Sequence, residues 1–339
     1  MTSKFARSIS LFTLLIGGLL FQSVHASSSD EIKSWFERMS IASTELSYKG
    51  RFVYNRDGET SLMEIIHVAG DQGSRERIVS LSGEVQELIR DQNGNVFLMN
   101  LGPPLLIDQG GRDIPLAVRI NANLDRLLEN YTFELAEIDR VAGYKSQIII
   151  ISPLDKNRYS YRLWVDVETG FLTRSQLLNE KGDVVEHIMF SDIELMREPT
   201  EAVLEAVLYG QDLSVASGAV VISNPVANDN NEVFWSVSGS PFGFLRTHSQ
   251  DKISLGDKKS VAYLMVTDGL ASVSIYIEPF KDKALIGASR AGALSAYGRV
   301  IDDYQITVIG EVPPITVKHI GDAVIQTQMS QHDDSGLQR

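Results

Sequence analysis

The sequence predicts an α+β protein of mostly antiparallel β-structure, with a large β domain followed by a smaller α+β domain. Three observations support this prediction. Short runs of β-branched and aromatic residues recur between turn signals such as Asp57-Gly58 and Asn93-Gly94. The run from Arg158 to Leu195 holds two strands around a Glu-Thr-Gly turn and then a third strand, which is an antiparallel meander. The segment from Ile222 to Glu232 loses all periodicity and marks a domain boundary.

The first predicted element is a signal peptide at residues 1–26. Lys4 and Arg7 precede a mostly apolar run from Ile9 to Phe21, and the small residues that a signal peptidase favours end at Ala26. As a helix, this run would cover roughly 20 Å, which is short of the roughly 30 Å hydrocarbon core of a membrane. We therefore expect cleavage after Ala26 and export, with a retained membrane helix as the alternative.

The large domain is predicted to span residues 27–222 and to begin with a helix from Glu31 to Thr44, whose apolar residues recur near one face. Short strands follow between turn signals, up to a break at Gly102 to Pro115. The remaining elements expected are a helix at Leu116 to Glu129, strands at Tyr131 to Ile138 and Tyr144 to Ser152, the meander, and a helix at Thr200 to Leu208.

The meander has two different faces. Alternation places Tyr161, Leu163 and Val165 on one face and Arg162 and Trp164 on the other. A large indole therefore projects away from its apolar neighbours. Such a sheet could bind something apolar on its second surface.

A concave apolar cavity would form if the large sheet curls while helices cover one side of it. Such a cavity is a natural pocket for an acyl chain. The alternative is that the same residues form ordinary core. The candidates for the cavity lining are Phe52, Tyr54, Ile65, Phe97 and Trp164.

A linker at residues 223–232 and a small domain at residues 233–328 complete the organisation, and the polar residues 329–339 are expected to form a flexible tail. A third strand of the small domain would stop at the Gly310 to Pro314 segment, where Pro314 can start a helix in its first turn. The elements expected are strands near Ser260 to Thr267 and Ala271 to Glu278, joined at Asp268-Gly269, a strand at Tyr304 to Gly310, and a helix from about Ile315 to Gln328.

The charge argues against nucleic acid as a partner. The formal net charge is −13, and acidic and basic side chains balance between Val233 and Ile325, so the excess acid lies in the first half. An acidic surface repels phosphate backbones, and no basic run accompanies an aromatic ladder.

The sequence contains almost none of the motifs that are typical of enzymes. The chain contains no cysteine, no His-Glu-x-x-His, no Gly-x-Ser-x-Gly and no phosphate loop. We therefore predict no enzymatic activity, no metal and no cofactor, with an exported hydrolase as the last-ranked alternative. The histidines considered as scattered metal ligands are His67, His187, His248 and His319.

Two stretches in different domains hold further recognisable patterns. The first is Tyr159-Ser160-Tyr161 with Trp164, Asp166 and Glu168-Thr169, continued by Leu177-Leu178, Gly182 and Glu186. The second is Asp268-Gly269-Leu270 with Ser272 and Ser274, followed by Ile306 to Pro314 with Thr316 and Lys318. Both stretches resemble the RseB/MucB family of periplasmic regulators, and the resemblance covers nearly all of the chain after the signal peptide.

The resemblance implies a periplasmic negative regulator of the envelope stress response. Members bind the periplasmic region of an RseA/MucA-like anti-sigma factor and shield it from the proteases that would release a sigma-E-type factor. The resemblance further implies that the large domain is an unclosed β-barrel with helices, similar to the carriers LolA and LolB. It would sense acyl chains of lipoprotein or lipopolysaccharide and release the anti-sigma factor.

The same resemblance places much of the partner contact in the smaller domain and the linker. The residues proposed for that contact are Phe242, Phe244, Val312 and Pro314. A periplasmic lipoprotein or lipid carrier is the alternative function, against which the second domain argues. A homo-oligomer is possible, because exposed sheet edges invite pairing.

Overall fold

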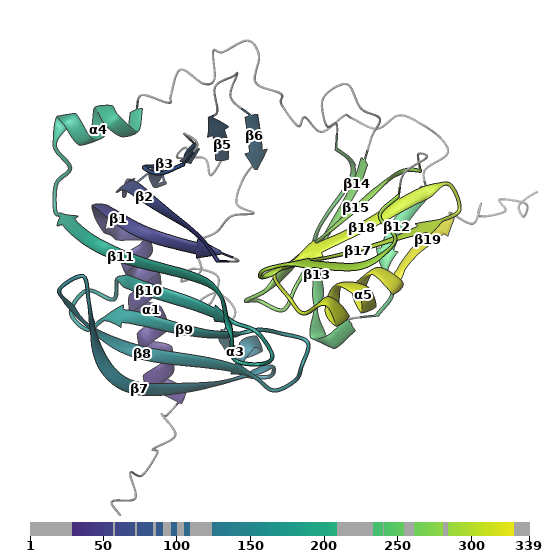
Figure 1. Cartoon of the computed structure of the whole chain (residues 1–339), viewed down its shortest axis with the longest axis horizontal. Helices are drawn as coiled ribbons and strands as arrows, with labels where there is room; N and C mark the ends of the chain where they lie inside the picture. The colour runs from purple at the N-terminus through teal and green to yellow at the C-terminus, as the bar shows by residue number, and fades with distance from the viewer. Residues whose placement is uncertain are drawn as a thin grey trace, which may run out of the picture.

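The computed structural model describes residues 29–56, 58–71, 73–83, 86–90, 96–99, 105–108, 124–208, 233–239, 241–253, 261–280 and 284–328. The predicted signal peptide, linker and tail lie outside these residues, and helix α1 begins at Ser29. No helix in these ranges is long and apolar enough to cross a membrane. The elements from α1 to α4 form the large unit, and those from β12 to β19 form the small unit (Figure 1).

The large unit is built on a single antiparallel sheet of eleven strands in the order β6-β5-β4-β3-β2-β1-β11-β10-β9-β8-β7. The two outermost strands, β6 and β7, do not pair with each other, so the sheet is unclosed. The strands are β1 (Ser47–Arg56), β2 (Glu59–Val68), β3 (Arg75–Ser80), β4 (Glu87–Arg90), β5 (Val96–Met99), β6 (Leu105–Asp108), β7 (Tyr131–Val141), β8 (Tyr144–Pro153), β9 (Ser160–Asp166), β10 (Leu172–Leu178) and β11 (Val184–Met196).

Helix α1 (Ser29–Glu45) crosses one face of this sheet (Figure 1). Its buried residues Ile32, Phe36, Met39 and Ala42 recur every three or four positions and so form one stripe. This stripe packs into the main core with the sheet residues that face it. The described part of the large unit also contains two shorter helices, α3 (Leu124–Leu127) and α4 (Glu201–Leu208).

The meander faces are as predicted. Tyr161, Leu163 and Val165 lie in the core beneath α1, whereas Trp164 belongs to a separate cluster on the other face. Trp164 is only 3% exposed there, because the Arg174 guanidinium lies 4.1 Å from its ring and its Nε1–H donates to Asp139. The indole is therefore covered by its own sheet.

The described residues of the small unit form a six-stranded antiparallel sheet, a two-stranded ribbon and one α-helix. The sheet order is β13-β14-β15-β18-β17-β16, and the ribbon pairs β12 with β19. Its elements are β12 (Val233–Val237), a 3₁₀ turn at Pro241–Gly243, β13 (Leu245–Ile253), β14 (Val261–Thr267), β15 (Ser272–Pro279), β16 (Gly287–Ala291), β17 (Leu294–Ile301), β18 (Tyr304–Gly310), α5 (Pro314–Asp322) and β19 (Val324–Gln328).

The mostly antiparallel α+β class and the unclosed large sheet confirm the predicted fold class. The predicted last helix, Ile315 to Gln328, is wrong in its second half. Helix α5 ends at Asp322, and the next residues form β19 because β12 pairs with them along its whole length. Strands β12, β13, β16 and β17 were not predicted. Of the predicted helix at Leu116 to Glu129, only Leu124–Leu127 is helical among the described residues.

Candidate functional site

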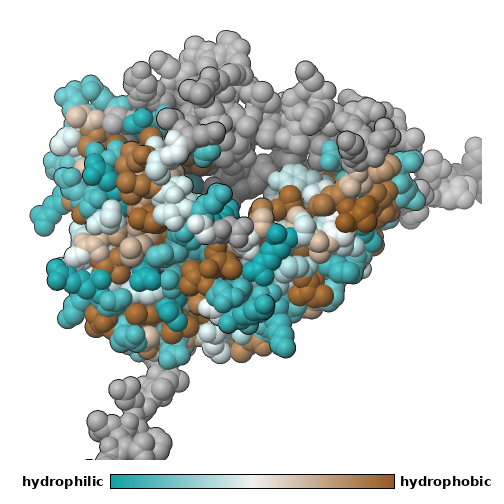
Figure 2. All heavy atoms as spheres, viewed as in Figure 1, coloured by the Kyte–Doolittle hydropathy of each residue, from teal (hydrophilic) through white to brown (hydrophobic). Residues whose placement is uncertain are grey.

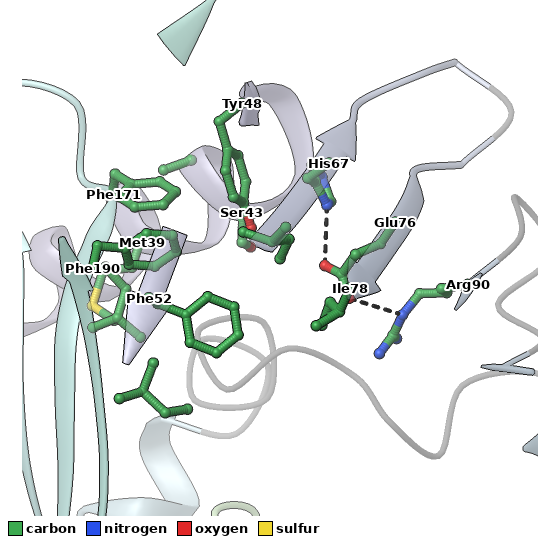
Figure 3. Close-up of a pocket in the computed structure, with 14 residues that line it drawn as sticks. Met39, Ser43, Tyr48, Phe52, His67, Glu76, Ile78, Arg90, Phe171 and Phe190 are labelled. Carbon is green, nitrogen blue, oxygen red and sulfur yellow. Dashed lines mark hydrogen bonds and ion pairs between the residues drawn. The ribbon is translucent and has the colours of Figure 1, made fainter. Parts of the chain in front are cut away.

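The large unit contains an apolar pocket of about 260 Å³ between α1 and the strands β1, β2, β3 and β11 (Figure 3). On the face of the molecule that Figure 2 shows, by contrast, hydrophobic residues form several separate groups rather than one broad patch. The pocket is lined by Met39, Ala42, Ser43, Tyr48, Phe52, Ile65, His67, Glu76, Ile78, Arg90, Phe171, Leu172, Ile188 and Phe190.

Aromatic rings form one wall of the pocket. Phe190 from β11 lies 5.6 Å from Phe52 on β1 and 5.2 Å from Phe171 in the turn before β10. Tyr48, also on β1, meets Phe171 edge to face at 4.7 Å. Tyr48 and Phe52 share a face because they are four residues apart on one strand. Packed edge-to-face rings hold one another in place, so this wall is preorganised.

Helix α1 forms part of the pocket lining, and the turn between β9 and β10 holds this helix close. Gly170 has φ +80° and lies so near the helix that an added Cβ would be 2.7 Å from the Arg38 carbonyl oxygen. The Arg38 side chain donates back to the Val167 carbonyl. Glycine is required at this position both for its left-handed backbone and for the close approach.

The other end of the pocket is polar. His67 Nδ1 lies 3.3 Å from Glu76 Oε2, and Arg90 Nε lies 3.8 Å from Glu76 Oε1 (Figure 3). The Tyr48 ring stacks on the His67 ring at 5.0 Å. Burial alone would raise the pKa of Glu76, but its hydrogen bond to His67 and the charges of His67 and Arg90 lower it. The carboxylate is therefore ionised inside an otherwise apolar pocket.

Only some of the residues predicted to line a cavity lie in the pocket. Phe52 and Ile65 line the pocket, but Trp164 and Tyr54 do not. Tyr54 donates to Glu186 at 3.1 Å, and Trp164 lies on the opposite face of the sheet. Phe97 is on β5, and its side chain lies outside the described parts of the structure. Sequence reasoning missed Tyr48, whose alternation with Phe52 was a usable signal, and Phe171 and Phe190, which come from other elements.

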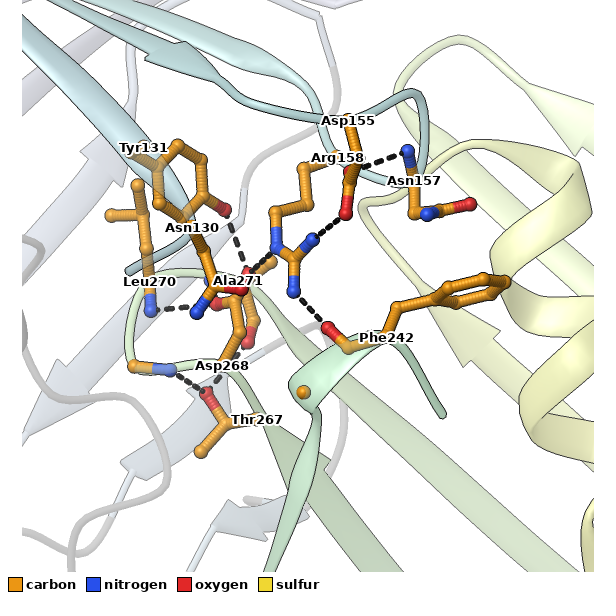
Figure 4. Close-up of polar contacts among 12 residues, drawn as sticks. Asn130, Tyr131, Asp155, Asn157, Arg158, Phe242, Thr267, Asp268, Leu270 and Ala271 are labelled. Carbon is orange, nitrogen blue, oxygen red and sulfur yellow. Dashed lines mark hydrogen bonds and ion pairs between the residues drawn. The ribbon is translucent and has the colours of Figure 1, made fainter. Parts of the chain in front are cut away.

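A second notable region joins the two units through a buried ion pair (Figure 4). Arg158 follows β8, is 1% exposed, and its Nε donates to Asp268 Oδ2 at 2.6 Å. Asp268, at the tip of the hairpin between β14 and β15, is fully buried and also accepts from the Tyr131 hydroxyl at 2.8 Å. Arg158 donates further to Asp155 and to the Phe242 carbonyl.

The tip of the same hairpin enters the core of the large unit. Leu270 is fully buried and belongs to the cluster that contains Leu127 and Tyr131. Other bonds across the contact run from Arg126 to the Gly243 carbonyl at 3.0 Å, and from the Thr316 hydroxyl to the Asn157 carbonyl at 2.8 Å. Burial and polar pairing together therefore fix how the two units meet.

A charged cluster forms another contact between the units. Arg56, the last residue of β1, pairs with Glu186 of β11 at 3.2 Å and with Glu311, which follows β18. Burial raises the pKa of Glu186, and the nearby Glu311 carboxylate raises it further, while Arg56 and the Tyr54 hydroxyl act in the opposite direction. Two carboxylates therefore share one guanidinium at this contact.

We expect this cluster to make stability depend on pH. A carboxyl whose pKa is raised in the folded state binds its proton more tightly there, so stability should rise as pH falls through that pKa and level off near the ordinary value of 4.5. Glu186→Gln should remove this rise. Urea denaturation from pH 7 to 4 measures it, and identical pH profiles for the two proteins would contradict the prediction.

The residues predicted to contact a partner lie around the contact between the units. Phe242 is half-buried, has φ +53°, and stacks on His319 at 4.9 Å. Pro314 is half-buried at the start of α5. Phe244 and Val312 are 1% and 0% exposed in the core of the small unit, so neither is accessible to a partner in this arrangement.

Both units of the chain match models of known protein domains. The model of the MucB/RseB N-terminal domain matches residues 31–208, and that of the MucB/RseB C-terminal domain matches residues 229–325. The sigma factor AlgU regulatory protein MucB of Pseudomonas aeruginosa is 32% identical, over 91% of this chain and 94% of its own. The sigma-E factor regulatory protein RseB of Escherichia coli K12 is 24% identical, over 92% and 96%.

Solved structures are similar over most of the chain. The complex of Pseudomonas aeruginosa MucA and MucB aligns with a TM-score of 0.63 at 27% identity, and it covers 86% of this chain and 98% of that one. A crystal structure of MucB alone gives a TM-score of 0.60 at 28% identity, covering 88% and 98%. The similarity therefore extends over both units.

Proposed function

The chain belongs to the MucB/RseB family, and from this we propose that it is a periplasmic regulator that binds the periplasmic region of a membrane anti-sigma factor. The observation that carries the proposal is the match of both units, in order, to a relative solved in complex with MucA. Binding would shield the anti-sigma factor from proteolysis, so the protein would act by occlusion rather than by chemistry.

The proposal includes release of the partner when an acyl chain enters the pocket. An apolar cavity of about 150 Å³ in an engineered protein is large enough to bind benzene, so about 260 Å³ can hold a hydrocarbon segment. Strand β1 carries Phe52 in the pocket and Arg56 at the contact with Glu311. Strand β11 likewise carries Phe190 and Glu186. A ligand that displaces the rings would therefore act on strands that also reach the small unit.

The second candidate function is a lipid or lipoprotein carrier. An apolar pocket suits a carrier as well as it suits a lipid-sensing regulator. The two candidates differ in whether an anti-sigma segment binds. A carrier would retain lipid without binding that segment, whereas a regulator should bind the segment and lose affinity when lipid is present.

We expect the protein without residues 1–26 to bind the periplasmic segment of the host's anti-sigma factor, and we expect an N-dodecanoyl peptide to weaken that binding. Isothermal titration calorimetry with and without the peptide measures both effects. Ser43→Trp should fill the pocket and remove the lipid effect while anti-sigma binding stays, because Ser43 lines the cavity. Ile41→Trp, on the exposed side of the same helix, is the control.

The outcomes separate the parts of the proposal. If the protein does not bind the anti-sigma segment, the proposed regulator function is wrong. If it retains the lipid in that case, the result favours the carrier function. If the segment binds but the acylated peptide does not change its affinity, the regulator function stands and release by an acyl chain is wrong.

A further inference from the structure

The volume of the pocket is small for a lipid chain. A cavity of about 150 Å³ binds benzene, which has six carbon atoms, so by proportion the pocket of about 260 Å³ holds about ten carbons. Such a volume limits the length of a bound chain only if the walls of the pocket cannot move apart. The contacts behind each wall therefore decide whether the limit applies.

The ring wall lies directly on the backbone of the sheet. Gly50 is on β1 between Tyr48 and Phe52, so a side chain at this position would point to the same face as theirs. A Cβ added at Gly50 would lie 3.0 Å from the ring of Phe190, which therefore occupies the space of the missing side chain. Phe171 packs against the same ring at 5.2 Å. The ring wall is thus already in contact with the strand behind it.

The opposite wall is helix α1, which contributes Met39 and Ala42 to the pocket lining. This helix is held by the turn between β9 and β10, where Gly170 approaches the Arg38 carbonyl and the Arg38 side chain donates to the Val167 carbonyl. The apolar stripe of the helix is also packed into the main core. An outward movement of α1 would break both sets of contacts, and packed interiors resist such movement.

The polar end excludes hydrocarbon. Glu76 Oε2 lies 3.3 Å from His67 Nδ1, and its Oε1 lies 3.8 Å from Arg90 Nε (Figure 3). A methylene group inserted among these side chains would separate the carboxylate from its partners inside the pocket. That separation costs more than the burial of one methylene gains. A hydrocarbon chain should therefore stop before this end, whatever polar group the ligand carries.

We propose that the pocket limits chain length: it takes one hydrocarbon chain of about ten carbons and leaves the further carbons of a longer chain in water. The proposal rests on the acyl-chain part of the proposed function and adds the class of chain, which is of medium length. Ala42 and Phe190 set the length, because they line the pocket from the helix and from the sheet.

The first measurement uses the unmodified protein without residues 1–26. N-acyl-glycinamides from hexanoyl to tetradecanoyl, in steps of one carbon, carry the same head on chains of increasing length. Isothermal titration calorimetry below their micelle concentrations gives each dissociation constant. The constant should fall about fourfold per carbon up to decanoyl, which is the gain from burying one methylene. From decanoyl to tetradecanoyl it should change by less than about twofold, because the added carbons stay in water.

Two variants should move this break in opposite directions. Ala42→Leu adds about three carbons to the helix wall, so the affinity should level off at about seven carbons. Phe190→Leu removes about three carbons from the ring wall, so the affinity should level off at about thirteen. Ala136→Leu is the matched control for Ala42→Leu, because Ala136 packs against the Trp164 cluster and does not line the pocket. Its break should stay at about ten carbons.

The results separate the inference from the function on which it rests. A dissociation constant that keeps falling about fourfold per carbon through tetradecanoyl overturns the length limit and leaves an acyl pocket in place. A break that stays at the same chain length in both folded variants overturns the assignment of Ala42 and Phe190. Absence of binding by every chain overturns the acyl-chain function and this inference with it, while anti-sigma binding is tested by its own experiment.

Discussion

Replacing Asp268 with alanine should lower the free energy of unfolding by about 3–5 kcal/mol, because the guanidinium of Arg158 loses its fully buried counter-charge and keeps only the partly exposed Asp155 carboxylate. Arg158 and Asp268 are 1% and 0% exposed, so bulk water does not solvate the guanidinium. The substitution also removes the acceptor for the Tyr131 hydroxyl. Urea denaturation followed by tryptophan fluorescence measures the change, since Trp35 and Trp164 report on the large unit and Trp235 on the small one.

Two further variants test whether the loss of the buried counter-charge causes this destabilisation. The double variant Arg158→Met with Asp268→Ala should be less destabilised than Asp268→Ala alone, because Arg158→Met removes the buried charge that has lost its Asp268 partner. Glu180→Gln removes the partly exposed pair that Arg290 makes with Glu180, at 3.7 Å, and it should cost no more than about 1 kcal/mol. A loss below about 1 kcal/mol for Asp268→Ala would show that the buried pair does not hold the units together.

Gly170→Ala should destabilise the protein by about 2–5 kcal/mol. A residue with a Cβ in the left-handed region costs about 1–2 kcal/mol, and forcing atoms into a packed interface costs about 1–3 kcal/mol more. Both terms apply, since Gly170 has φ +80° and its added Cβ would lie 2.7 Å from the Arg38 carbonyl oxygen. Thermal and urea denaturation measure the loss, and because α1 must move, lipid binding should weaken as well.

Gly182→Ala is the matched control for the close approach. Gly182 has nearly the same backbone conformation, with φ +83°, but an added Cβ there meets nothing within 4 Å. Only the conformational cost of about 1–2 kcal/mol should remain. If the two alanine variants lose the same free energy of unfolding, the contact between α1 and the β9–β10 turn does not contribute to stability.

Local patterns predicted the elements whose causes are local. The meander, the Asp268-Gly269 hairpin and the first helix follow from turn residues and from apolar spacing, and all three are present. The last helix was extended too far because β19 exists only through its pairing with β12, which is about ninety residues earlier in the chain. Propensity at residues 324–328 contains no information about that distant partner.

The candidate site was predictable to the same limited extent. A cavity formed by a curled sheet predicts Phe52 and Ile65 in its lining, and both line the pocket. Alternation correctly placed Trp164 on the other face of its strand from Leu163, but it could not show that this face turns away from α1. The polar end needed His67 and Glu76 to meet across the β2–β3 pairing, where they are direct partners.

The sequence by itself determined the fold class, the family and the two faces of the meander, because turns, alternation and motifs act over a few residues. Only the tertiary structure decided which face became a pocket, since that depends on where α1 lies across the sheet. It also decided that Arg158 and Asp268, 110 positions apart, form a buried pair between the units. Burial of charge is stable only when distant segments meet with complementary groups, and no local pattern encodes that meeting.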